Sequence, residues 1–226
     1  MMQGRKISVV IPAKNEEKTI AEIIVGAKPY SDEVLVVDGH STDHTRDIAK
    51  KLGARVELDH GRGKGDAIRI AIEKARGDII LFIDADGSHD PHDIPKIVAP
   101  ILNGEADMVI GSRGRGGSDE AWGTIGDFIR NVGGHMTILA INYRYNARLT
   151  DSQNGFRALT TVLAKKLNLK EDITTIEQEM LTKALKLKAR VTDVPSHEYK
   201  RKFGNSRFKV WKVAPRYIWS ILKCMF

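Results

Sequence analysis

Two carboxylates stand two residues apart at the end of an apolar run, where both could hold one metal ion. The run covers residues 79–83, and Asp84 and Asp86 follow it directly. Such a run is typical of a strand buried on both faces of a parallel sheet. Residues two apart in a strand point the same way, and ligands bind beyond the carboxyl ends of such strands. The acids therefore predict a site for Mg²⁺ or Mn²⁺ with phosphate oxygens. The alternative is a strand end whose acids are solvated or cap a helix.

A second candidate for chemistry is the glycine-rich basic stretch 61–65, which contains Lys64 and precedes a predicted helix. Backbone N–H groups at a helix start attract anions, so Lys64 is predicted to contact a phosphate. The stretch is not a P-loop, because it lacks the Gly-x-x-x-x-Gly-Lys-Ser/Thr pattern. It is not a convincing dinucleotide fingerprint either, because that should follow the first strand.

The elements that must position these residues alternate along the chain up to residue 112. Apolar runs predict strands, and apolar residues at helical spacing predict helices. The predicted strands cover 7–11, 33–38, 54–58, 79–83 and 107–110, and the predicted helices cover 17–28, 43–52, 65–76 and 91–102. This alternation predicts an α/β fold with a mostly parallel sheet flanked by helices.

The pattern changes after residue 112. The glycine-rich basic stretch 113–119 predicts a mobile loop, while 151–158 reads as extended or looped. Helices are predicted at 125–141 and 176–187, and a strand at 190–194. We expect a donor-binding part (1–112), an acceptor-binding part of the same domain (113–207) and an amphipathic tail (208–226). The aromatic and basic tail predicts either an interfacial membrane helix or a helix packed on the body.

Composition narrows the class of protein and of partner. The 226 residues are 42% hydrophobic and 29% charged, which is ordinary for a soluble globular protein with a sizeable core. Lys+Arg 36 against Asp+Glu 29 gives a net charge of +7, which suggests an anionic partner. No recognition-helix pattern or stacking motif supports nucleic acid. One cysteine, Cys224, excludes an internal disulfide and fits a reducing compartment. We see no secretory signal and no membrane-spanning run, so we expect a cytoplasmic protein.

Short motifs in a fixed order resemble those of family 2 glycosyltransferases. In chain order, the motifs cover residues 12–17, 36–43, 63–65, 75–78, 84–86, 111–113, 151–157 and 201–207. Each motif is weak alone, but their order over residues 7–207 is specific. Gly39 departs from the usual form, which has a second acid there. The later motifs are most similar to dolichyl- or polyprenyl-phosphate sugar transferases. The resemblance implies the A-type fold of nucleotide-sugar transferases.

The resemblance also implies a donor site for a GDP- or UDP-sugar. Asp86 is the first choice for direct metal ligation, with Asp84 nearer the ribose or the metal, and Arg201 would bind the diphosphate. Each of three residues also has a purely structural interpretation. Glu16 could stabilise the start of a helix by its charge, Asp38 could be a hydrogen-bonded turn carboxylate, and Arg201 could belong to a solvated basic run. The expected donor residues are Pro12, Ala13, Glu16, Asp38, Lys64, Asp84, Ala85, Asp86 and Arg201.

The acceptor decides whether the reaction needs a base. A sugar hydroxyl must lose a proton, and Asp151 holds the place where hydroxyl-using relatives tend to keep a carboxylate base. A lipid monophosphate is already anionic and needs cationic holders instead, which Arg113, Arg115 and Arg130 could supply. The basic excess and the tail favour a polyprenyl (dolichyl) phosphate at a membrane surface. We therefore expect an inverting, metal-dependent hexosyltransferase that is peripheral at the inner face of the membrane.

Two further functions compete with this interpretation. A sugar-phosphate nucleotidyltransferase would want a Gly-rich, Arg-containing loop after the first strand, and residues 13–16 are not that. A non-catalytic nucleotide-sugar binding protein is disfavoured by the retained Asp84, Asp86 and Arg201. His89 and His92 have a possible metal-ligand spacing, but polar loop histidines are the favoured interpretation.

Overall fold

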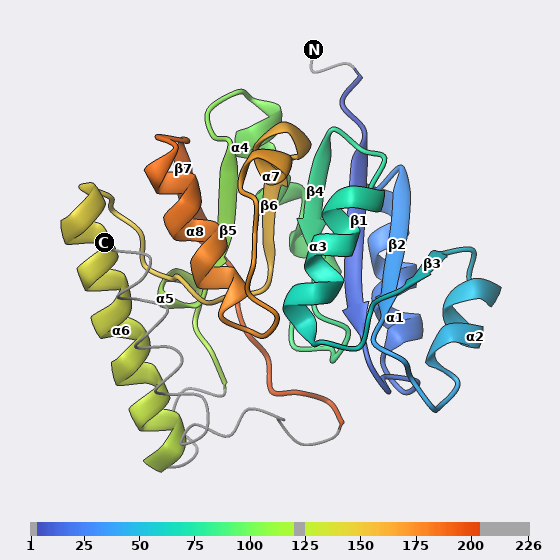
Figure 1. Cartoon of the computed structure of the whole chain (residues 1–226). Coiled ribbons are helices and arrows are strands. Elements are labelled where there is room, and N and C mark those ends of the chain that lie inside the picture. The colour runs from blue at the N-terminus through green and yellow to red at the C-terminus, as the bar shows by residue number, and fades with distance from the viewer. Residues whose placement is uncertain (1–3, 120–124, 204–226) are drawn as a thin grey trace.

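The computed structural model describes residues 4–119 and 125–203, and for 125–131 it describes the backbone alone (Figure 1). The chain forms one seven-stranded sheet in the order β3-β2-β1-β4-β6-β5-β7. The strands are β1 (Ile7–Ala13), β2 (Glu33–Asp38), β3 (Arg55–Leu58), β4 (Ile79–Phe82), β5 (Met108–Ser112), β6 (Arg157–Thr160) and β7 (Val191–Pro195). The helices are α1 (Ile20–Ala27), α2 (Thr45–Lys51), α3 (Lys64–Lys74), α4 (Ile94–Leu102), α5 (Arg113–Gly116), α6 (Ile125–Tyr145), α7 (Thr161–Lys166) and α8 (Ile176–Lys186).

The mostly parallel sheet predicted from the sequence is confirmed. Each paired set of strands is parallel except at β6, which runs antiparallel to both β4 and β5. The carboxyl ends of β1, β2, β3 and β4 therefore meet at one edge of the sheet. The sheet continues through β6 and β7, so the strands of the predicted acceptor part complete the sheet begun by the donor part. The division at residue 112 stays a prediction.

Helices cover both faces of the sheet, and side chains alternate between the two cores. One core joins α3, α7 and α8 to residues such as Val10 and Ile80, and the other joins α1 and α4 to residues such as Val9 and Leu81. In Figure 1, α3 and α8 lie on the near face of the sheet. All four residues of β4 are buried, as expected for a central strand between two helical layers.

The segment 113–119 differs from the mobile loop predicted for it. Its first four residues form the single turn α5, and Ser118 pairs with Glu198 as an isolated bridge. A Cβ atom at Gly116 would overlap the backbone of Ser196. This glycine permits close packing, so glycine content here reflects contact with a neighbouring segment rather than mobility.

Two predictions concern the membrane. No helix in the described ranges is both long enough and apolar enough to cross a bilayer. The amphipathic tail predicted at 208–226 lies outside the described residues.

Candidate active site

A pocket of about 460 Å³ opens where β1, β2, β3 and β4 end. Its walls come from the turns after these strands, from the start of α3, from the loop before α8 and from the segment after β7. Six of the nine expected donor residues line it: Pro12, Ala13, Glu16, Lys64, Asp84 and Arg201. The fold therefore gathers in one cavity residues that lie up to 189 positions apart, from 12 to 201.

Asp84 lies at this pocket beside Lys64, the first residue of α3. The Lys64 Nζ atom is 2.6 Å from Oδ1 of Asp84 and 2.9 Å from Oε1 of Glu177 in α8. Burial works against the charged carboxylate, but the Lys64 charge holds the pKa of Asp84 below its ordinary value. Burial likewise opposes the ammonium, but the two carboxylates raise the pKa of Lys64. Lys64 thus reaches the predicted phosphate region, where its charge is shared between two acids.

Asp86 is held by the segment that follows β7. Arg201 Nη2 lies 2.7 Å from its Oδ2, and Nη1 of the same guanidinium lies 3.7 Å from Glu16. Ser88 donates its backbone N–H (3.0 Å) and its hydroxyl (2.6 Å) to Oδ1. The arrangement brings Arg201 to the pocket and to the second acid at once, as expected for a residue that would bind the diphosphate.

The donor atoms at this edge fit a divalent cation. Carboxylate oxygens are hard ligands, and Mg²⁺ is usually held by one or two carboxylates together with water and substrate phosphates. Within residues 4–119 and 125–203, no group of three His, Cys, Asp or Glu side chains converges on one point. Asp84 and Asp86 would therefore hold the ion with the donor's phosphates, and they are now paired with Lys64 and Arg201.

Asp38 and His89 lie deeper than their sequence suggested. Asp38 is fully buried and accepts the backbone N–H of Ser41 at 2.9 Å, while its Oδ1 has no hydrogen-bond donor in the described part of the chain. Its role toward ribose or base stays a prediction, with Oδ1 as the free acceptor. His89 lies in a loop, as predicted, but its side chain is 3% exposed and packs on Phe156 at 5.1 Å between ring centroids. His92 is exposed, as expected.

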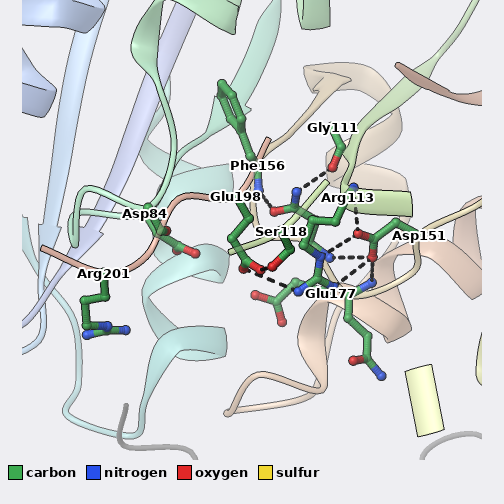
Figure 2. Close-up of polar contacts among 12 residues, drawn as sticks. Asp84, Gly111, Arg113, Ser118, Asp151, Phe156, Glu177, Glu198 and Arg201 are labelled. Atoms are coloured by element: carbon green, nitrogen blue, oxygen red, sulfur yellow. Dashed lines mark hydrogen bonds and ion pairs between the residues drawn. The ribbon is translucent and has the colours of Figure 1, made fainter. Parts of the chain in front are cut away.

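Arg113, one of the predicted acceptor residues, and Asp151, the predicted base, form a second charged cluster with Glu198 (Figure 2). Arg113 binds Asp151 through Nε (2.6 Å) and Nη2 (3.0 Å), and its Nη1 lies 3.4 Å from Glu198. Glu198 also accepts the hydroxyl of Ser118 at 2.5 Å. Burial opposes ionisation of Asp151, but the Arg113 charge and its hydrogen bonds lower the pKa of Asp151 to about 2. A carboxylate with this pKa is a weak proton acceptor at neutral pH.

The three predicted acceptor arginines have different surroundings. Arg115 donates to the carbonyl oxygen of Asp193 at 2.7 Å and lies 3.3 Å from its carboxylate. Arg113 is likewise held by acids. The side chain of Arg130 lies outside the described residues. Phosphate binding by these arginines stays a prediction.

Two site residues were missed from the sequence. Glu177 is 2% exposed and completes the Lys64 pair from 113 positions away. Gly155 has no side chain to separate that pair, since a Cβ there would lie 2.7 Å from Asp84 Oδ2 and 2.8 Å from Lys64 Nζ. The available signal for Glu177 was its place in the first turn of α8, close to the buried apolar residues Ile176, Met180 and Leu181 of the same helix.

Comparison with known proteins settles the family. The model of "Glycosyl transferase family 2" matches residues 8–170. The chain belongs to this family. It is therefore a glycosyltransferase, as the order of its motifs predicted. It is 34% identical over 204 residues to "Glycosyltransferase AglJ" of Haloferax volcanii, which covers 88% of this chain and 65% of that protein. The chain thus spans slightly less than two thirds of that relative.

Two other similar proteins bear on the substrates. A protein of Methanococcus voltae named "UDP-N-acetylglucosamine--dolichyl-phosphate N-acetylglucosaminyltransferase" is 29% identical over 82% of this chain and 83% of its own. A crystal structure of glucosyl-3-phosphoglycerate synthase from Mycobacterium tuberculosis with Mn²⁺, UDP and glucosyl-3-phosphoglycerate superposes with a TM-score of 0.75. That match is 26% identical and covers 98% of this chain and 80% of the other. The likeness confirms the A-type glycosyltransferase fold.

Proposed function

We propose that this glycosyltransferase moves a hexose from a GDP- or UDP-sugar to a polyprenyl phosphate, with inversion and with Mg²⁺ or Mn²⁺ held by Asp84 and Asp86. The observation that carries the proposal is the acidic edge of the pocket, where Asp84 and Arg201 line the cavity and Arg201 contacts Asp86. The mycobacterial neighbour with Mn²⁺ and UDP supports the same ligands here.

The roles of the residues follow from their charges. When bound, the cation offsets the negative charge that develops on the leaving diphosphate. Arg201 adds a preorganised positive charge at the same place, because its guanidinium already faces the pocket. Pro12 and Ala13 form the wall beside β1, where the nucleotide would lie. In-line attack on a donor held in this pocket would invert the anomeric centre.

A phosphate acceptor suits this site better than a hydroxyl. A lipid phosphate is anionic at neutral pH and attacks without a base, whereas a hydroxyl acceptor requires one. Asp151, the residue expected to serve as that base, is paired with Arg113 and has a pKa of about 2. The name of the Methanococcus voltae relative supports a dolichyl-type acceptor. The net charge of +7 supports work at an anionic membrane surface, and we infer a peripheral enzyme at the inner face.

The proposal is tested with purified protein, Mn²⁺, labelled UDP- and GDP-hexoses, and a short polyprenyl phosphate. We expect labelled lipid with one nucleotide, none with the corresponding polyprenol, and none after EDTA treatment. Asp86→Asn should lower kcat by about 100-fold or more, because transition-state charge loses its main counter-charge. Transfer to polyprenol or to a glycan hydroxyl, with none to the phosphate, would refute the acceptor. Full activity in EDTA would refute the metal.

A further inference from the structure

Three charged side chains form one row that starts at the wall of the donor pocket and ends at a buried glutamate behind it. Glu177 belongs to α8, Lys64 begins α3, and Asp84 follows β4. The ammonium of Lys64 lies between the two carboxylates, 2.9 Å from Glu177 and 2.6 Å from Asp84. Asp84 faces the pocket, and Glu177 is buried behind the pocket wall.

We propose that Glu177 is a positioning residue that acts through Lys64 and keeps Asp84 able to attract a divalent cation. This inference rests on the proposed function, because it concerns the same metal and donor site. Glu177 need not touch the ion, since its effect passes through the ammonium that it contacts.

The charges of the three side chains explain how Glu177 would act on Asp84. Lys64 alone would cancel the charge of Asp84, and its ammonium would repel a divalent cation at that carboxylate. Glu177 adds a second negative charge to the same ammonium, so the row of three carries a net charge of −1. The lysine can then fix the position of Asp84 without neutralising the site.

Within the described ranges, the ion pair of the Glu177 carboxylate is with Lys64, and the charge of the buried Arg157 guanidinium also acts on that carboxylate. Its Oε2 is buried without a hydrogen-bond donor, and Lys64 is the partner of Oε1. A buried carboxylate costs stability unless it is paired, so this ion pair accounts for its presence. Arg157 donates to the backbone carbonyl of Glu177 rather than to its side chain, at 2.7 Å.

The packing holds the row together. Gly155 passes so close that a Cβ would meet both Lys64 Nζ (2.8 Å) and Asp84 Oδ2 (2.7 Å). The absence of a side chain at Gly155 lets Lys64 and Asp84 meet there, and the contacts of 2.6 Å and 2.9 Å hold the ammonium between its two acids. A change of charge at Glu177 should thus be felt at Asp84 and not be absorbed by movement of Lys64.

The test measures Mn²⁺ affinity by isothermal titration, with and without UDP or GDP, on the full chain. Glu177→Gln should weaken Mn²⁺ binding by about 10-fold, because Lys64 then cancels Asp84. Adding Lys64→Met to that variant should restore the affinity to within about 3-fold of the wild type, because the net charge of −1 returns. A merely structural role for Glu177 would not be rescued by removing its partner.

The matched control is Glu179→Gln on the same helix. Glu179 is also buried, at 4% exposed, but it accepts backbone N–H groups of Lys170 and Glu171 and pairs with Lys183. The Glu179→Gln substitution should leave the Mn²⁺ affinity unchanged. If circular dichroism shows that Glu177→Gln does not fold, Glu177→Asp withdraws the carboxylate by one methylene and should weaken binding by about 3-fold.

The outcomes separate the two proposals. A wild-type protein that binds no Mn²⁺, even with nucleotide, refutes the proposed metal site itself. A wild type that binds Mn²⁺, with folded Glu177 variants unchanged or with no rescue by Lys64→Met, leaves the proposed function standing and overturns the role of Glu177.

Discussion

The donor and acceptor clusters are both built from aspartate paired with a basic residue, but the contacts differ in kind. At the donor pocket, Asp84 meets Lys64 and Asp86 meets Arg201, each through one basic nitrogen at 2.6 Å and 2.7 Å. Asp84, Lys64 and Arg201 face the cavity, and their side chains keep about a quarter of their surface exposed. A diphosphate can therefore meet Lys64 and Arg201, and a cation can meet Asp84, from the cavity side.

The acceptor cluster is tighter. Arg113 meets Asp151 through two nitrogens and reaches Glu198 with a third, and Asp151 is 6% exposed. Paired charge-assisted bonds of this kind are strong and fix geometry. They tie the end of β5 to the loop before β6 and to the segment after β7. The donor pairs are thus accessible from the cavity, whereas Arg113, Asp151 and Glu198 form a structural clamp at the acceptor side.

The largest effect should come from breaking the clamp. Asp151→Asn removes one partner of a buried ion pair, which costs about 3–5 kcal/mol in free energy of unfolding. Asp84→Asn, in a partly exposed pair, should cost under about 1 kcal/mol. Urea unfolding of both variants measures the difference. Equal losses of unfolding free energy in the two variants would contradict the distinction between the acceptor clamp and the accessible donor pair.

The same variant separates clamp from base. If Asp151 acts only in the clamp, Asp151→Asn should keep kcat, calculated per folded protein, within about 10-fold of the wild type. If Asp151 is a general base, the same change should lower kcat by about 100- to 10,000-fold. The larger loss, with a hydroxyl acceptor, would favour the alternative reaction.

A smaller effect is the response of stability to acid. The pKa of Asp151 is lowered from 3.8 to about 2 in the folded protein, so its ionised form favours folding. This contribution, about 2–3 kcal/mol, is present above pH 4 and is lost as the pH falls from 4 to 2. Urea unfolding at pH 7, 4 and 2.5 should show it. Asp151→Asn should lack this part of the slope, and identical slopes in both proteins would contradict it.

The donor half was more predictable than the acceptor half for a physical reason. Strands β1, β2, β4 and β5 carry apolar runs, and their order places Asp84 and the residues after β1 at one edge without knowledge of side-chain contacts. Strand β6 has four residues, of which the first two end the stretch 151–158 that is predicted to be extended or looped, so its antiparallel place between β4 and β5 was missed.

Side-chain partners were the least predictable feature. Glu177 meets Lys64 only because α8 and α3 pack on the same face of the sheet. The burial of His89 and the clamp on Arg113 likewise depend on segments distant in sequence, near Phe156 and Glu198. Local patterns reveal which residues carry charge, whereas the packing decides which charges meet.

The smallest effect should come from the outer rim of the donor site, where an exposed pair contrasts with the clamp. Lys202, next to Arg201, lies 2.5 Å from Oε1 of Glu22 in α1, and both side chains are at least 44% exposed. Exposed pairs contribute at most about 1 kcal/mol, so Glu22→Gln should change the free energy of unfolding by under about 0.5 kcal/mol. The KM for the nucleotide-sugar should change by less than about 2-fold, because Arg201 keeps its own contact with Asp86. Steady-state kinetics and urea unfolding measure both quantities. A KM raised about 10-fold would show instead that this rim pair holds the Arg201 segment in place, since that is roughly 1.4 kcal/mol of binding.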